Sequence, residues 1–272
     1  MKPLMLQPLI EGFLRKGARH HRSKPFTMRN TAPLVSFTFD DVPASAYING
    51  AAILQQHGLR GTFYIAAGTC GTLDEDEHWR VIDRDQVRAL HHQGHEIGCH
   101  TFSHVKVDQV DARTLDEECR RNGALLRELC PGTEITNFCY PFGRVSLPRK
   151  LQLQDRFDSC RGIYEGINAG VVDLALLRVI ELYDRTLTPE KLRRVLRDTR
   201  ERNGWLIFYS HDVAEPPSWI GSSPRLLREA IAAVQAENIR CLTVRDALDA
   251  IGYRRPAQEP ANVNARAASG SR

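Results

Sequence analysis

The sequence predicts an α/β domain with parallel strands, arranged as an open sheet or as a barrel. From Pro33 onward, short β-rich apolar runs alternate with stretches of helical periodicity. The connections between these elements are short, and repeated strand–helix–strand units of this kind place their strands parallel. The chain has 272 residues and no break in composition. Barrels of the α/β class commonly form one domain at this length.

The predicted strands are short runs of apolar and β-branched residues. They cover residues 34–39, 61–66, 95–99, 135–140, 205–209 and 239–243, with weaker candidates at 157–163 and 176–180. The predicted helices have apolar residues at helical spacing and cover residues 44–57, 83–92, 111–129, 188–202, 224–237 and 245–251. Some helix ends are recognisable: Gly58 closes the first helix, Asp83 is a suitable N-cap, and Pro189 occupies a first helical position.

Two flanking segments differ from the predicted domain, which spans residues 31–254. Residues 1–30 form a basic N-terminal segment, in which apolar and basic residues alternate between Leu6 and Lys24. A basic amphipathic helix of this kind can lie on an anionic membrane surface, and the other interpretation is a helix that covers one end of the domain. Residues 255–272 lack apolar periodicity, which predicts a disordered tail.

The composition narrows the functional class. Charged residues make up 26% of the chain and the formal net charge is +4, with the basic residues scattered, so nucleic-acid binding is not expected. No stretch approaches the ~18 consecutive apolar residues of a membrane span. The N-terminus lacks a secretory signal pattern, and the seven cysteines are widely spaced without a CxxC pair. These features predict a cytoplasmic protein with free thiols.

Residues that could bind a metal follow several of the predicted strands. Asp40 and Asp41 follow the first strand, His100 and His104 follow the third, and His211 follows the strand at residues 205–209. The carboxyl ends of parallel strands share one face, and βα barrels build their active sites there. Scattered structural histidines would not be expected to share one end, so the positions favour a functional site.

The spacing of His100 and His104 suggests how they would cooperate. Two imidazoles four residues apart point the same way if they lie on one helical turn. Together with the carboxylate of Asp41 they would form a three-ligand site that holds Zn²⁺ and leaves a position for water. His91 and His95 have the same spacing, but Gly94 lies where a helix would end. That second pair is therefore not expected to share a face.

The neighbouring residues supply the other groups that a hydrolysis needs. Asp40 is adjacent to a proposed ligand and would be the general base, whereas His211 would protonate the leaving amine from the opposite side. The turn at residues 141–143 could direct a backbone N–H at the developing oxyanion. The sequence therefore predicts a metal-dependent hydrolase. Taken alone, each residue also has an ordinary structural explanation, such as a turn, a cap or a polar strand end.

Four motifs in this order resemble those of the polysaccharide deacetylases, the family-four carbohydrate esterases. They are Thr38-Phe39-Asp40-Asp41, His100-Thr101-Phe102-Ser103-His104, Tyr140-Pro141-Phe142-Gly143 and Leu206-Ile207-Phe208-Tyr209-Ser210-His211. The resemblance extends over roughly residues 34–243 and implies a single-domain distorted (β/α)7 barrel. It also implies removal of N-acetyl groups from amino sugars, with Asp40 as base and His211 as acid. Asp41, His100 and His104 would be the metal ligands, and the backbone amide of Phe142 would help to hold the oxyanion.

The sequence departs from the family pattern in two places. The third motif usually carries an arginine that orients the catalytic aspartate, and Cys139 stands in its place. Arg144, just past the turn, is a candidate to reach the same carboxylate. The aspartate and tryptophan of the fourth motif, which usually support the acid histidine, have no clear match. Asn168, Asp173 and Asp184 are candidates for part of that role.

The sequence thus predicts a metal-dependent N-deacetylase that acts on N-acetylhexosamine units of a polysaccharide or of its lipid-linked precursor, in exopolysaccharide biosynthesis. Zn²⁺ is the expected metal, although other divalent ions such as Co²⁺ fit the same ligands. One alternative is a hydrolase of another non-peptide C–N bond, such as a sugar formamide or a cyclic amide. Another is a degenerate member of the family that binds glycan without turnover. The sequence leaves the oligomeric state open.

Overall fold

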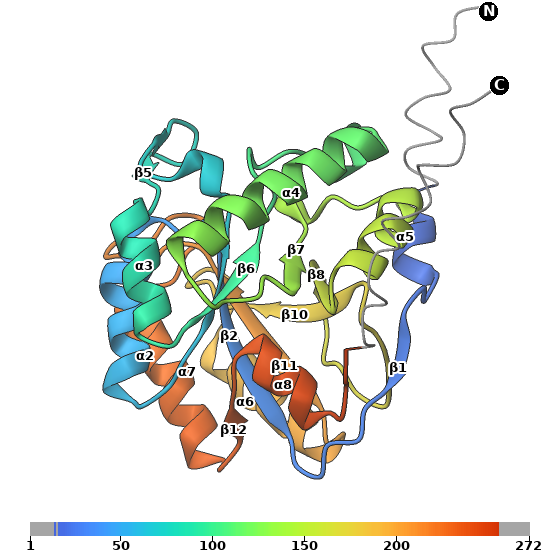
Figure 1. Cartoon of the computed structure of the whole chain (residues 1–272). Coiled ribbons are helices and arrows are strands. Elements are labelled where there is room, and N and C mark those ends of the chain that lie inside the picture. Colours follow the sequence, from blue (N-terminus) through green and yellow to red (C-terminus); the bar gives the residue numbers. More distant parts are fainter. Residues whose placement is uncertain (1–13, 15, 256–272) are drawn as a thin grey trace, which may run out of the picture.

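A closed barrel of parallel strands lies at the centre of the computed structural model, which describes residue 14 and residues 16–255 (Figure 1). Its strands, in barrel order, are β2 (Leu34–Asp40), β3 (Thr62–Ile65), β6 (Glu96–Cys99), β7 (Asn137–Cys139), β8 (Ser159–Glu165), β10 (Leu177–Glu181) and β11 (Trp205–Ser210). The last strand pairs with the first in a parallel register from Trp205↔Leu34 to Ser210↔Phe39. This pairing closes the ring and confirms the predicted (β/α)7 barrel.

The barrel is distorted where its pairing is weakest. The short strand β7 joins β6 through the single register pair Cys99↔Phe138. Between β8 and β10 the register shifts between Leu177 and Val179. The predicted strand at 239–243 is reduced to β12 (Arg240–Cys241), which pairs with the beginning of β2 beside the ring.

Helices surround the barrel, mostly where the sequence predicts them. They are α2 (Ala52–Gln56), preceded by a π-helical stretch at Ala46–Ala51, then α3 (Arg84–His92), α4 (Ala112–Leu129), α6 (Pro189–Glu201), α7 (Pro224–Ala236) and α8 (Val244–Ala250). Asp83 is the N-cap of α3, and its side chain accepts from the Gln86 N–H in a capping box. The structure adds α5 (Leu147–Arg156), which was not predicted; its only buried side chains are those of Lys150 and Leu153.

Two short antiparallel pairs extend the fold at its edges. β1 (Pro25–Thr27) pairs with β9 (Val171–Asp173), and β4 (Leu73–Asp74) pairs with β5 (Trp79–Arg80). The β4–β5 hairpin belongs to the loop that follows β3, at the carboxyl end of the barrel. It brings Asp74 and Glu77 to the mouth of the barrel.

The described part of the basic N-terminal segment packs against α5 (Figure 1). The buried ammonium group of Lys150 donates to the carbonyl oxygens of Ala18 (2.7 Å) and His21 (2.6 Å). This contact places the described part of the segment beside α5, and the interpretation of a helix that covers one end of the domain stays a prediction. Residues 1–13 and 15 and residues 256–272 lie outside the described residues, so the membrane contact and the disordered tail stay predictions. No helix of the described chain has the length and apolar character to span a membrane.

The alternation of side chains along β2 decides what faces the barrel interior. Phe37 and Phe39 join the apolar core cluster that also contains side chains of α7, and they stack on Phe208 and Phe63 respectively. The intervening residues point the other way. The side chain of Asp40, the last residue of the strand, therefore enters the barrel interior, where it is almost fully buried.

Candidate active site

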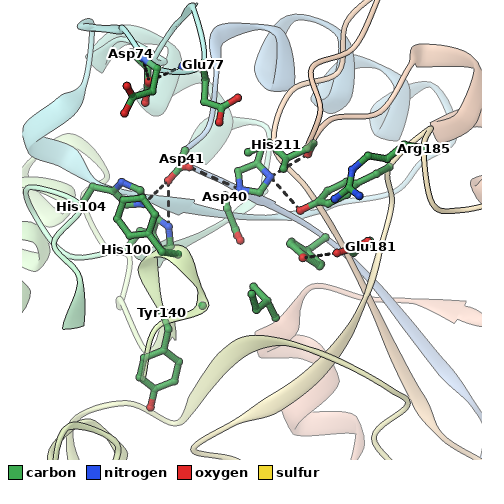
Figure 2. Close-up of a pocket in the computed structure, with 17 residues that line it drawn as sticks. Asp40, Asp41, Asp74, Glu77, His100, His104, Tyr140, Glu181, Arg185 and His211 are labelled. Carbon is green, nitrogen blue, oxygen red and sulfur yellow. Dashed lines mark hydrogen bonds and ion pairs between the residues drawn. The ribbon is translucent and has the colours of Figure 1, made fainter. Parts of the chain in front are cut away.

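A cavity of about 420 Å³ opens at the carboxyl ends of the barrel strands (Figure 2). All the predicted site residues line it: Asp40, Asp41, His100, His104, Phe142 and His211. Asp40 ends β2 and His211 follows β11 directly, while His100 begins the loop after β6. The structure therefore brings these residues together from four different strand ends, at the face expected from the sequence.

Asp41, His100 and His104 converge on one point. The Nε2 atoms of His100 and His104 lie 3.2 and 2.9 Å from Asp41 Oδ1. One potential ligand atom from each of the three residues lies within 4.8 Å of the others. In a tetrahedral zinc site, ligand atoms are about 3.3 Å apart, because the bonds to the metal are about 2.0–2.1 Å long. The observed separations are close to this value.

The polar atoms of this cluster are poorly satisfied by the protein itself. Asp41 Oδ1 and His104 Nε2 are buried, yet neither makes a hydrogen bond of acceptable geometry within the described chain. Buried polar atoms without a partner are rare in folded proteins. A carboxylate and two imidazoles that face one another in this way fit a divalent metal ion.

The loop that carries the two histidines is not helical, so the expected helical turn is wrong. Both Thr101 (φ 61°) and His104 (φ 54°) adopt left-handed backbone conformations. The buried carboxylate of Glu118, on α4, accepts hydrogen bonds from the backbone N–H groups of Phe102 (2.9 Å) and Ser103 (2.7 Å). The two rings converge because α4 holds this loop in a tight turn, and their spacing along the sequence is not the cause.

Other contacts set the orientation of the ligands. His100 Nδ1 lies 2.8 Å from the carbonyl oxygen of Cys139, which leaves its Nε2 atom facing Asp41. Burial would raise the pKa of Asp41, but the close polar contacts with the rings of His100 and His104 hold it well below its usual value. Asp41 is therefore ionised at neutral pH, as a metal ligand must be.

Asp40 lies deeper than Asp41 and pairs with Arg161 of β8. The guanidinium of Arg161 donates to Asp40 Oδ1, and its side chain is fully buried. It lies over the rings of Tyr64 and Tyr209, 4.9 and 5.2 Å from their centroids. Burial would raise the pKa of Asp40, but the charge of Arg161, followed by those of His100 and His211, lowers it below its usual value. The carboxylate is thus held ionised inside the barrel.

Cys139 stands where the third motif usually has an arginine, and the arginine that pairs with Asp40 is instead Arg161. Cys139 and Arg161 are register partners across β7 and β8, and Cys139 Sγ also contacts Asp40 Oδ2 at 3.4 Å. The arginine expected from the third motif is thus replaced by one that stands one strand further around the barrel. Arg161 was not among the predicted site residues, although it lies within the strand candidate at residues 157–163, where a buried arginine needs a partner. Arg144 does not take this role, because its Nε donates to Asp108 (2.8 Å).

His211 is supported differently from the family pattern. Its Nδ1 atom lies 3.0 Å from the carbonyl oxygen of Ile220 and 3.4 Å from the hydroxyl of Tyr183. The ring of Trp79 stacks on it with centroids 6.1 Å apart. The carbonyl partner places the proton on Nδ1, so Nε2 faces the cavity, 3.7 Å from Asp41 Oδ2.

The three candidates for the fourth motif have other contacts. Asn168 hydrogen-bonds the backbone of Arg178 and Trp205. Asp173 pairs with Lys150, and Asp184 accepts a hydrogen bond from the backbone of Ser223. The structure therefore does not bring any of them to His211.

Phe142 stands in the wall of the cavity beside the cluster. Its ring centroid is 4.3 Å from that of His104, and the side chain is 52% exposed. Its backbone is left-handed (φ 58°), and Gly143 after it is left-handed as well. A side chain at Gly143 would overlap Ile163. Glycine at this position therefore favours the turn, which sets the backbone of Phe142 at the cavity.

Comparison with known proteins identifies relatives of this site and fold. Residues 27–155 match the family model described as polysaccharide deacetylase. This range contains Asp40, Asp41, His100, His104 and Phe142, and it ends before Arg161 and His211.

Among curated proteins, the chain is 25% identical over 114 residues to a chitooligosaccharide deacetylase of Sinorhizobium fredii. It is 24% identical over 109 residues to a chitin deacetylase of Arthroderma benhamiae. The two matches cover 41% and 40% of this chain. They span 48% of the first relative and only 27% of the second.

The fold is shared with solved structures at low sequence identity. The chitin deacetylase of Colletotrichum lindemuthianum superposes with a TM-score of 0.55 at 20% identity. That superposition covers 84% of this chain and 91% of the other. The likeness therefore extends beyond residue 155 and includes most of the barrel.

Proposed function

The chain belongs to the polysaccharide deacetylase family, and on this premise we propose that it is a metal-dependent N-deacetylase of N-acetylhexosamine units in a polysaccharide or its lipid-linked precursor. The observation that carries the proposal is the meeting, in one cavity, of the Asp41–His100–His104 cluster with a buried aspartate and a histidine. The names of the two curated relatives, which refer to chitooligosaccharide and chitin, support this class of substrate.

Asp41, His100 and His104 would hold the metal, for which Zn²⁺ or Co²⁺ is expected. A divalent ion at this position would polarise the acetamide carbonyl and lower the pKa of a bound water molecule. The protein contributes the fixed geometry of the ligands, because Glu118 and the Cys139 carbonyl hold the histidine loop and the His100 ring.

Asp40 would act as the general base. Its lowered pKa keeps the carboxylate ready to accept a proton from the attacking water at neutral pH. Arg161 holds Oδ1 from inside the barrel, so Oδ2, which accepts the weaker contact of the Cys139 thiol (3.4 Å), would take this role. A base whose orientation is set in advance needs no rearrangement during the reaction.

His211 would act as the general acid. Its Nδ1–H is held by the Ile220 carbonyl oxygen, so the acid form is the imidazolium, which carries a second proton on Nε2. Nε2 faces the cavity across from the metal ligands and would donate that proton to the leaving amine nitrogen, which leaves the ring neutral. The backbone N–H of Phe142, in the opposite wall, would donate to the oxyanion that develops on the carbonyl.

The test is acetate release from N-acetylglucosamine oligomers by the purified full chain. The protein is stripped of metal and then supplied with Zn²⁺ or Co²⁺. The proposal expects release that depends on the metal and is lost in Asp40→Asn. Asp85→Asn, which removes an exposed carboxylate on α3, should leave the activity unchanged.

Two results would count against an N-acetyl substrate. Release of formate from a sugar formamide, without acetate release from N-acetyl sugars, would favour hydrolysis of a different C–N bond. Binding of the oligomers by metal-loaded protein without any turnover would favour a glycan-binding role. The cellular location stays a prediction, and cell fractionation would test it.

A further inference from the structure

Arg185 lines the cavity and is held in place by aromatic rings. It lies four residues beyond the end of β10, and its Nε atom donates to the carbonyl oxygen of Trp219 (2.6 Å). Its guanidinium carbon is 4.6 Å from the ring centroid of Trp219 and 5.3 Å from that of Tyr183. These contacts restrict a side chain that would otherwise be flexible.

The outer edge of this guanidinium has no partner within the described residues. Neither Nη atom makes a hydrogen bond or an ion pair there. Glu181 lies in the same cavity wall, but its carboxylate accepts from the Tyr209 hydroxyl (3.4 Å) and does not pair with Arg185. By contrast, Asp40 neutralises the charge of Arg161. Among the described residues that line this cavity, Arg185 is thus the one arginine.

Apart from Glu181, which shares the wall of Arg185, the carboxylates of the cavity rim lie on another side. Figure 2 shows Asp74 and Glu77 on the β4–β5 hairpin, away from Arg185, with Asp41 and His211 between them. An anionic group would be repelled by the hairpin and attracted to Arg185. A substrate with one anionic end would therefore bind in a single orientation across the catalytic residues.

From these contacts we propose that Arg185 binds an oxyanion of the substrate, so that the substrate is an anionic amino sugar. The inference rests on the proposed N-deacetylase function. The flat fork of a guanidinium suits two oxygens of a phosphodiester or of a carboxylate. The oxyanion would be the phosphodiester of a lipid-linked sugar or the carboxylate of a neighbouring uronic acid. Because Arg185 is already positioned, little side-chain entropy is lost on binding.

The experiment compares three ligands that share N-acetylglucosamine. One is the neutral methyl glycoside, one carries a methyl phosphodiester at C1, and one is a disaccharide with glucuronic acid. The kcat/KM of each is measured with the metal-loaded full chain, and binding is measured by calorimetry with metal-loaded Asp40→Asn protein. The expected preference for one of the anionic ligands is about 10- to 100-fold, the range for a hydrogen bond to a charged group. The preferred ligand identifies the source of the oxyanion.

Substitutions of Arg185 distinguish binding of the substrate's negative charge from structural support of the loop after β10. Arg185→Gln should abolish the preference through KM and leave the neutral glycoside within about threefold, whereas Arg185→Lys should retain part of it. Arg120→Gln, which removes an exposed arginine on α4, is the matched control. An equal loss on all three ligands, or no preference in the wild-type protein, would overturn the inference. If no ligand is turned over, the proposed function fails, and the binding data still decide whether Arg185 selects the anion.

Discussion

Arg161 and Asp40, which stand 121 positions apart in the sequence, form a buried ion pair inside the barrel. Cys139 stands beside Arg161 on the next strand, as its register partner. The guanidinium of Arg161 lies over the rings of Tyr64 and Tyr209. The arginine that pairs with Asp40 therefore stands one strand away from the third-motif position at Cys139, at the same level in the barrel.

Replacement of Arg161 should cost both stability and activity. In Arg161→Ala the carboxylate of Asp40 remains buried without its partner, which costs about 3–5 kcal/mol. Urea unfolding should detect this loss, and acetate release should fall more than about 100-fold because the base loses its orientation. Arg178→Ala, on the exposed face of β10, is the control and should stay close to wild type.

A double variant tests whether the position of the arginine matters. Adding Cys139→Arg to Arg161→Ala returns the charge to the strand where the family motif usually has it. We expect the double variant to recover part of the stability and activity lost in the single one. A double variant no better than Arg161→Ala would contradict the idea that the two positions are equivalent.

Metal binding should depend on His104, and it should not depend on His91, which has the same spacing to His95 as His100 has to His104. Removal of metal should lower the melting temperature, because an ion that binds only the folded state at 100 times its Kd adds about 2.7 kcal/mol. His104→Ala should abolish the rise in melting temperature on adding Zn²⁺. His91→Ala, from the pair that the structure does not bring to the cavity, should retain it. The same response in both variants would speak against the assigned ligands.

Glu118 should tune the metal affinity without touching the metal. Its carboxylate holds the loop between the two histidines, so Glu118→Ala should weaken Zn²⁺ binding about 10- to 100-fold in competition with a fluorescent chelator. Glu117→Ala is the matched control, since this neighbouring carboxylate is exposed and pairs with Arg120 on the same helix. An unchanged affinity in Glu118→Ala would mean that the loop holds its shape alone.

His211 should matter most for poor leaving groups. His211→Gln should lower kcat on N-acetylglucosamine oligomers by about 10²–10⁴-fold with the metal content unchanged. The loss should be much smaller on 4-nitrophenyl acetate, because the phenolate leaves without being protonated. Asp40→Asn should affect both substrates, since each needs activated water. Equal losses for His211→Gln on both substrates would argue against the role of general acid.

His95 should make the fold sensitive to acid. It is buried and accepts a hydrogen bond from the Gly61 N–H (3.0 Å), and burial, with a contribution from Arg60, lowers its pKa to about 4. Between pH 6.5 and 4 the unfolded chain binds the proton and the folded chain does not, so stability falls as the pH falls. The full shift corresponds to about 3 kcal/mol. Unfolding free energies at pH 7 and pH 4 should therefore differ less in His95→Gln than in the wild type.

The sequence by itself determined the elements and most of the site. Strand and helix positions depend on local patterns, such as the apolar run of β11 and the capping box at Asp83. The shared end of parallel strands was enough to place Asp40, Asp41 and His211 in one cavity. The sequence did not predict α5, because its buried Lys150 interrupts the apolar face by which a helix is recognised.

Only the tertiary structure decided how these residues are held. The partner of Asp40 lies on β8, and the partner of His211 is the backbone carbonyl of Ile220, which has no signature in the sequence. The histidine loop converges because Glu118 reaches it from α4. These contacts join elements far apart in the chain, and they depend on strand order and on the reach of side chains across the barrel. Local sequence patterns contain no information about either.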